Sequence, residues 1–167
     1  QKIADSYSDL SPVPGRMETL AIEGRPLAVI DYAHTPDALA KVLQALRPLA
    51  RQRGGRLCCV FGCGGDRDAS KRPLMAAAAA AGADHLVITS DNPRSEDAGA
   101  IIADILTGLP ASASAQVQAD RAIAIATALQ QAGAQDVVLI AGKGHENYQE
   151  IRGQKLPFSD RALAEAA

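Results

Sequence analysis

The fold is decided by residues 56–89, which read RLCCVFGCGGDRDASKRPLMAAAAAAGADHLVIT. Apolar runs at 56–61 and 85–89 flank an alanine-rich segment at 73–81. Short apolar runs bounded by glycine and polar residues are typical of buried strands, and alanine is the strongest helix former. The pattern therefore predicts a strand, a helix and a second strand, which together make one parallel βαβ unit.

The same alternation continues on both sides of this unit. Apolar periodicity predicts helices at 37–50, 96–109 and 121–132 and strands at 17–23, 27–32, 115–118 and 137–141. The first two strands are separated by Gly24-Arg25-Pro26, which is typical of a hairpin or of two adjacent strands. Successive βα units indicate an α/β fold, a doubly wound and mostly parallel sheet with helices on both faces.

Composition and charge narrow the classes of function. The chain has 167 residues, a net charge of -2, 3% aromatic residues and no tryptophan. A chain of this length usually forms one domain, and the lack of a basic surplus and of stacking aromatics disfavours nucleic acid as a partner. No apolar run approaches the roughly 20 residues of a membrane span, and the first residues lack the apolar segment of a signal peptide. We expect no membrane association.

Three cysteines, Cys58, Cys59 and Cys63, fall close together in the chain. Two of them lie in an apolar run that predicts a buried strand, which favours reduced thiols and a cytoplasmic location. A structural zinc site would need further ligands at suitable spacing, and the three histidines are isolated from one another. We therefore expect no metal site.

Polar or glycine-rich residues follow four of the predicted strands. These segments are Asp31–Pro36, Gly62–Asp68, Asp91–Arg94 and Gly142–Glu146. Ligands of a doubly wound sheet gather beyond the carboxyl ends of its strands, so we expect the four segments to converge on one rim. Their charged residues are of both signs: Arg67, Asp91, Arg94 and Glu146. Such a set suits an amino acid with carboxylates and ammonium groups at both ends; alternatively, these are surface charges paired with one another.

Two nucleotide-binding motifs fail on this sequence. In the dinucleotide fingerprint that would begin at Gly62, the third glycine position holds Arg67. In the phosphate loop that would contain Gly142-Lys143, Val137 stands at the first glycine position and Gly144 stands where serine or threonine is needed. The chain therefore carries no complete ATP site of that kind.

Several motifs resemble, in content and in order, those of one family. They are Gly15-Arg16-Met17-Glu18, Asp31-Tyr32-Ala33-His34-Thr35-Pro36, Phe61-Gly62-Cys63-Gly64-Gly65-Asp66-Arg67-Asp68, Lys71-Arg72-Pro73, Asp91-Asn92-Pro93-Arg94 and Ala141-Gly142-Lys143-Gly144-His145-Glu146. From Gly15 to about Asp160 the chain looks like the C-terminal domain of the Mur ligases that add meso-diaminopimelate to UDP-MurNAc-L-Ala-D-Glu.

The resemblance implies a division into domains and a reaction. Residues 1–16 would be a linker from a missing central ATP-binding domain, and 17–167 the C-terminal amino-acid-binding domain. In such a ligase the ATP γ-phosphate activates the D-glutamyl side-chain carboxylate, the diaminopimelate amine displaces phosphate, and Mg²⁺ offsets the charge. ATP, Mg²⁺ and the UDP sugar would be bound mainly by the missing domains. The isolated domain is accordingly expected to be inactive.

The resemblance also implies site residues. Contacts to meso-diaminopimelate would come from Arg67, Asp91, Asn92, Pro93, Arg94, Gly142 and Glu146. Members of the family that add L-lysine generally lack arginine at the position of Arg94, which is consistent with the missing second carboxylate of lysine. Arg16, Asp31 and His34 would approach the nucleotide, unless Arg16 anchors the linker and His34 caps the following helix. No catalytic role is implied for Lys143 or His145.

Two other classes of function remain open. One is the same fold in a related ligase, either an L-lysine-adding enzyme or a folylpolyglutamate synthetase. The other is a non-enzymatic α/β module that binds a small molecule. The motifs at 91–94 and 142–146 favour the diaminopimelate ligase.

Overall fold

A computed structural model describes residues 15–167, and the predicted linker at 1–16 falls almost wholly outside that range. Within it, a six-stranded sheet has the order β1-β2-β6-β3-β4-β5, and β7 and β8 form a separate pair. The strands are β1 Glu18–Leu20, β2 Leu27–Asp31, β3 Leu57–Phe61, β4 His85–Ile88, β5 Gln116–Val117, β6 Val137–Ala141, β7 Tyr148–Ile151 and β8 Gln154–Pro157. Among the strands described, only β1 runs antiparallel in the large sheet. The mostly parallel sheet is as predicted.

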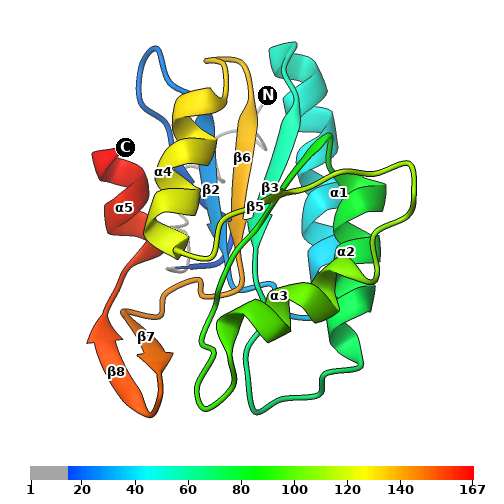
Figure 1. Ribbon diagram of the computed structural model, residues 1–167. Helices are drawn as coiled ribbons and strands as arrows, with labels where there is room; N and C mark the ends of the chain where they lie inside the picture. Colours follow the sequence, from blue (N-terminus) through cyan, green and yellow to red (C-terminus); the bar gives the residue numbers. More distant parts are fainter. Residues whose placement is uncertain (1–14) are drawn as a thin grey trace, which may run out of the picture.

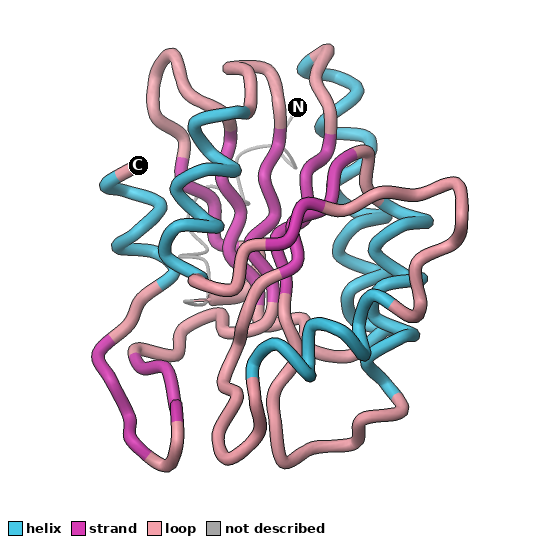
Figure 2. Tube along the Cα trace, in the orientation of Figure 1, coloured by secondary structure: helices cyan, strands magenta, loops and turns pink. Residues whose placement is uncertain are grey.

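Helices cover both faces of this sheet, as Figures 1 and 2 show. They are α1 Pro36–Arg53, α2 Lys71–Gly82, α3 Ala98–Leu106, α4 Arg121–Gln131 and α5 Asp160–Ala166. The first three pack on one face and the last two on the other. The predicted doubly wound α/β fold is therefore confirmed.

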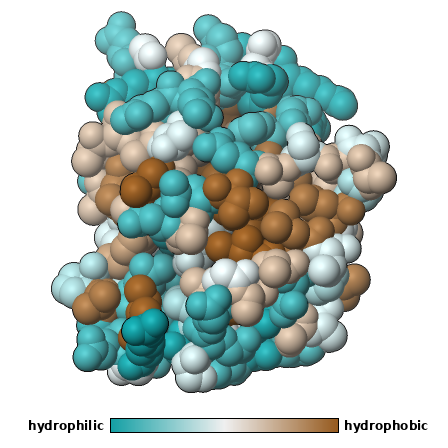
Figure 3. Space-filling view, in the orientation of Figure 1, coloured by the Kyte–Doolittle hydropathy of each residue, from teal (hydrophilic) through white to brown (hydrophobic). Residues whose placement is uncertain are grey.

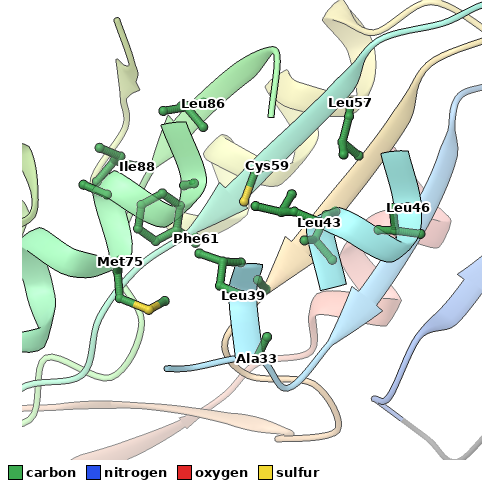
Figure 4. Close-up of a cluster of buried hydrophobic side chains, with 14 of the residues drawn as sticks. Ala33, Leu39, Leu43, Leu46, Leu57, Cys59, Phe61, Met75, Leu86 and Ile88 are labelled. Atoms are coloured by element: carbon green, nitrogen blue, oxygen red, sulfur yellow. The ribbon is translucent and has the colours of Figure 1, made fainter. Parts of the chain in front are cut away.

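Side chains along each central strand alternate between the two faces. Cys59 and Phe61 of β3 belong to the core under α1 to α3, which Figure 4 shows in close-up. Cys58 and Val60 belong to the core under α4 and α5. Because both faces are covered, the whole strand is buried, which explains its continuous apolar run.

The helix starts differ in detail from the prediction. Thr35 caps α1, its hydroxyl accepting the N–H of Ala38 at 3.2 Å, so the alternative role of His34 as the cap is wrong. α2 begins at Lys71, two residues earlier than predicted; Ser70 precedes it, and the Ser70 hydroxyl donates to Oδ1 of Asp68 at 2.6 Å and does not cap the helix. α3 begins at Ala98, two residues later than predicted, because Asp97 caps it, and it ends at Leu106, three residues earlier than predicted.

The hairpin β7–β8 and helix α5 were not predicted. In Figure 1 the hairpin lies at the same edge as the carboxyl ends of the parallel strands. Arg152 and Gly153 form its turn with φ values of 50° and 75°, which is the left-handed geometry that two-residue hairpin turns require.

The surface in Figure 3 is mostly polar, with apolar side chains gathered across the middle of the view. Val117 and Ile123 are among the exposed apolar residues. The edge strand β5 has only two residues, which limits the open edge it offers to other chains. Within residues 15–167, none of the helices combines the length and apolarity needed to cross a membrane.

Candidate functional site

The four polar segments converge, as predicted, on one cavity of about 540 Å³ at the carboxyl ends of β2, β3, β4 and β6. Each segment contributes to its wall. The lining residues are Tyr32, His34, Thr35, Gly62, Cys63, Gly64, Arg67, Asp68, Lys71, Arg72, Met75, Asp91, Asn92, Arg94, Gly142, Glu146 and Tyr148.

Two glycines allow the strand ends to come this close. A Cβ on Gly62 would lie 2.3 Å from the carbonyl oxygen of Thr89, so only glycine lets the end of β3 pack against the loop after β4. Gly142 has φ 115°, and a Cβ there would lie 2.6 Å from Oδ2 of Asp91. The glycine therefore keeps the Asp91 carboxylate unobstructed on that side.

Asp91 is a buried carboxylate on the cavity wall, with 7% of its surface exposed. Burial raises the pKa of its carboxyl above the ordinary value, while the positive charges of Arg121 and Lys143 oppose that rise. Nζ of Lys143 lies 3.7 Å from Oδ1 of Asp91. An ammonium group that enters the cavity would likewise stabilise the charged form of the buried Asp91 carboxylate.

Lys143 lies at the centre of a polar network beside the cavity. Its side chain is fully buried, and Nζ donates to Oδ1 of Asn92 at 2.8 Å and to Oε2 of Glu146 at 3.1 Å. Nδ2 of Asn92 donates to the same Oε2 at 3.0 Å. These contacts fix the Glu146 carboxylate through one oxygen; among the described residues, Oε1 accepts no hydrogen bond.

Guanidinium groups supply the positive side of the cavity. Arg94 is half-buried, and its Nη1 donates to the carbonyl oxygen of Gly65 at 2.7 Å. Arg67 is exposed, and among residues 15–167 its guanidinium donates only to the carbonyl oxygen of its neighbour Asp66, at 3.3 Å. Both therefore retain N–H groups with which to bind a carboxylate bidentately. Pro93, between Asn92 and Arg94, is buried and does not line the cavity.

Arg72 also reaches the cavity wall but is committed elsewhere. Its two terminal nitrogens donate to Glu96 and Asp104 at 2.8 Å. It had no predicted role, and it ties α2 to α3 and to the loop before α3. We assign it to the framework of the site.

The three residues predicted on the nucleotide side differ in their surroundings. Asp31 is buried, and its two oxygens accept the backbone N–H groups of Met17 and Ala33, both at 2.8 Å. It therefore holds the start of the described chain against the end of β2. Arg16 and His34 are exposed, and His34 lines the cavity beside Tyr32. Their contact with a nucleotide stays a prediction.

Two further residues behind the site, Arg121 and Asp160, had no predicted role. Both are fully buried and paired with each other. Each begins a helix, far from the other in the sequence, so no local pattern distinguished them from surface charges. Across residues 15–167, no group of three or more histidine, cysteine, aspartate or glutamate side chains is arranged to hold a metal ion.

These features define a class: a doubly wound α/β domain whose strand ends enclose a small cavity bearing guanidinium and carboxylate groups. Such a cavity can hold a small ligand with charges of both signs. The chain belongs to the Mur ligase family, since residues 15–144 match the family model described as "Mur ligase, glutamate ligase domain".

Several curated relatives carry the name UDP-N-acetylmuramoyl-L-alanyl-D-glutamate--2,6-diaminopimelate ligase. The relative from Acidovorax sp. (strain JS42) is 64% identical over 95% of this chain and 32% of its own length. The relative from Chromobacterium violaceum is 57% identical over 100% of this chain and 34% of its own length. The chain thus spans about a third of the curated relatives it matches.

Solved structures agree with this placement. A structure of a ligase with the same name superposes with a TM-score of 0.83 at 48% identity, covering 94% of this chain and 32% of that one. The bifunctional folylpolyglutamate synthase/dihydrofolate synthase from Yersinia pestis CO92 shares the fold, with a TM-score of 0.63 at 24% identity over 82% of this chain and 30% of that one.

Proposed function

We propose that this chain is the amino-acid-binding domain of an ATP-dependent ligase that adds meso-diaminopimelate to UDP-MurNAc-L-Ala-D-Glu. The observation that carries the proposal is the cavity that brings segments 91–94 and 142–146 together with Arg67. The relatives named after this reaction support it, at 57–64% identity over nearly the whole chain.

The charges of the cavity match the two kinds of group in meso-diaminopimelate. The guanidiniums of Arg94 and Arg67 would bind a carboxylate, Arg94 through the N–H groups that Gly65 leaves free. Asp91 and the free oxygen of Glu146 would accept from an ammonium group. Arg94 would then be the residue that prefers diaminopimelate to L-lysine, because lysine has no second carboxylate.

The contribution of this domain to the ligase would be positioning. A ligand held at both ends presents its attacking amine in one orientation, which makes the encounter with the acyl group nearly unimolecular. Asn92 contributes by fixing Glu146, and Gly142 by leaving room beside Asp91. Closure of the domain against the rest of the ligase would exclude water from the reacting groups.

The described residues do not fit a complete site for ATP and Mg²⁺. Residues 15–167 contain no phosphate loop, and the ammonium group next to Gly142 is buried against Asn92 and Glu146. We therefore place ATP, Mg²⁺ and the UDP sugar in the remaining two-thirds of the ligase. A structure of the Yersinia pestis synthase was solved with AMPPNP and a Mn ion.

The linker at 1–16 and the cytoplasmic location stay predictions.

Titration calorimetry of the chain with meso-diaminopimelate, L-lysine and L-glutamate tests the proposal. We expect saturable heat with meso-diaminopimelate, much weaker binding of L-lysine, and loss of the meso-diaminopimelate signal in Arg94→Ala. Tighter binding of L-lysine or L-glutamate would favour one of the related ligases. Absence of binding by all three would leave the module without its proposed ligand and overturn the proposal.

A further inference from the structure

The unpredicted hairpin β7–β8 is bound to the segment that carries Arg94. The backbone N–H of Arg94 donates to the carbonyl oxygen of Glu150 at 3.0 Å, and that of Arg152 donates to the carbonyl oxygen of Arg94 at 2.7 Å. These bonds make a parallel bridge between Arg94 and Ile151. Arg94 has φ 54°, a left-handed conformation that costs a non-glycine residue about 1–2 kcal/mol unless its surroundings hold it. The hairpin supplies that hold.

Side chains extend this attachment to the residues before Arg94. Glu150 N–H donates to Oδ1 of Asn92 at 3.0 Å. Nε2 of Gln149 donates to the carbonyl oxygen of Asp91 at 2.7 Å. The strand β7 therefore contacts three of the four residues in segment 91–94.

The guanidinium of Arg94 is held from two sides. Nε lies 3.5 Å from Oε2 of Glu150, and Nη1 donates to the carbonyl oxygen of Gly65. A Cβ on the cavity-lining Gly64 would lie 2.8 Å from Nη1, so the group packs directly over that glycine. The remaining N–H groups, on Nη1 and Nη2, form the end-on fork that binds a carboxylate with two hydrogen bonds.

We propose that Glu150 is a positioning residue for carboxylate recognition: it occupies the Nε side of Arg94 and so keeps the end-on fork of the guanidinium available to the cavity. The ligand named in the test rests on the proposed function, whereas the geometry of Arg94 does not. An unrestrained arginine side chain loses considerable rotamer freedom when it binds a ligand. Because Glu150 already restrains Arg94 in the free protein, less of this entropy is lost on binding.

Two substitutions separate orientation from charge. Glu150→Ala removes the carboxylate that lies 3.5 Å from Nε and should weaken binding of meso-diaminopimelate by roughly three- to tenfold, the range expected when one immobilised side chain regains its rotamer freedom. Glu150→Gln keeps an oxygen acceptor without the charge and should stay within about threefold of wild type. Gln154→Ala, on the exposed strand β8, and Glu23→Gln, far from the cavity, are the matched controls and should bind as wild type does.

A second measurement needs no ligand. Hydrogen exchange of the Arg94 Nε–H, followed by ¹H–¹⁵N NMR, should be slow in wild type and Glu150→Gln and at least several-fold faster in Glu150→Ala. Unchanged exchange in Glu150→Ala overturns the inference, as does a Glu150→Gln variant that binds as weakly as Glu150→Ala. If wild type fails to bind meso-diaminopimelate, the proposed function is wrong, and the exchange rates alone decide the role of Glu150.

Discussion

Arg121 and Asp160 form a two-point ion pair inside the protein, with Nε–Oδ1 at 2.8 Å and Nη2–Oδ2 at 2.7 Å. The guanidinium also donates to the carbonyl oxygens of Ser90 and Ala141, at 3.2 and 3.0 Å. These residues immediately precede Asp91 and Gly142. The pair thus joins α4 and α5 to the two strand ends that carry the site.

Removal of one partner of this pair should destabilise the fold strongly. Asp160→Asn leaves a buried guanidinium without its counter-charge, which typically costs about 3–5 kcal/mol in the free energy of unfolding. Glu165→Gln is the control, since it alters an exposed helix pair with Arg161 and should cost no more than about 0.5 kcal/mol. Urea unfolding followed by circular dichroism measures both, and equal losses would contradict the structural role of Asp160.

Arg94→Ala in the complete ligase should damage the use of meso-diaminopimelate far more than the use of ATP. Truncating one side of a desolvated charge pair costs about 2–5 kcal/mol, or roughly 30- to several-thousand-fold in binding. Arg94→Lys should also fail substantially, because an ammonium group cannot replace the planar fork. Steady-state kinetics with meso-diaminopimelate and L-lysine check this. Equal losses for the two amino acids, or a change confined to the KM for ATP, would show that Arg94 has another role.

Gly142→Ala and Gly24→Ala form a matched pair at positive φ. Both should lose about 1–2 kcal/mol of stability from backbone strain. A Cβ at Gly24 meets no atom within 4 Å, whereas one at Gly142 approaches Asp91. Only Gly142→Ala should therefore weaken meso-diaminopimelate, on the order of tenfold or more, because displaced binding groups lose their alignment. Thermal unfolding measures the loss of stability, and calorimetry measures the affinity for meso-diaminopimelate. Equal affinities in the two variants would contradict the proposed role of Gly142 beside Asp91.

Asp91→Asn should stabilise the chain while abolishing ligand binding. Burial raises the pKa of the Asp91 carboxyl in the folded protein above the ordinary value of 3.8. At pH values between the pKa of the unfolded chain and the raised pKa of the folded protein, the folded state binds more protons than the unfolded state. Stability therefore falls as the pH rises through that window. The Tm advantage of Asp91→Asn over wild type should accordingly be larger at pH 7 than at pH 3.5. The same Tm advantage at both pH values would mean that folding does not raise the pKa of the Asp91 carboxyl.

The sequence was informative where burial leaves a continuous pattern. Residues 57–61 and 137–141 are apolar throughout because helices cover both faces of the sheet, and the polar segments that follow them could be placed on one rim by topology alone. The hairpin gave no such signal, because β8 is exposed along its whole length and no face alternates.

The framework behind the site was not predictable for a different reason. Arg121 and Asp160 meet across 39 positions of sequence, and their burial depends on α5, which has only seven residues. No catalytic role was implied for Lys143, and its burial was not foreseen: its ammonium group is buried because Asn92 and Glu146 surround it. Such pairings arise from the tertiary structure and leave no periodic trace.

A crystal structure of the chain with bound meso-diaminopimelate tests the central claim most directly. One carboxylate should lie within hydrogen-bond distance of Nη1 or Nη2 of Arg94, and an ammonium group should lie between Asp91 and Glu146. A ligand bound outside this cavity, or one whose carboxylates both point away from Arg94, would contradict the account.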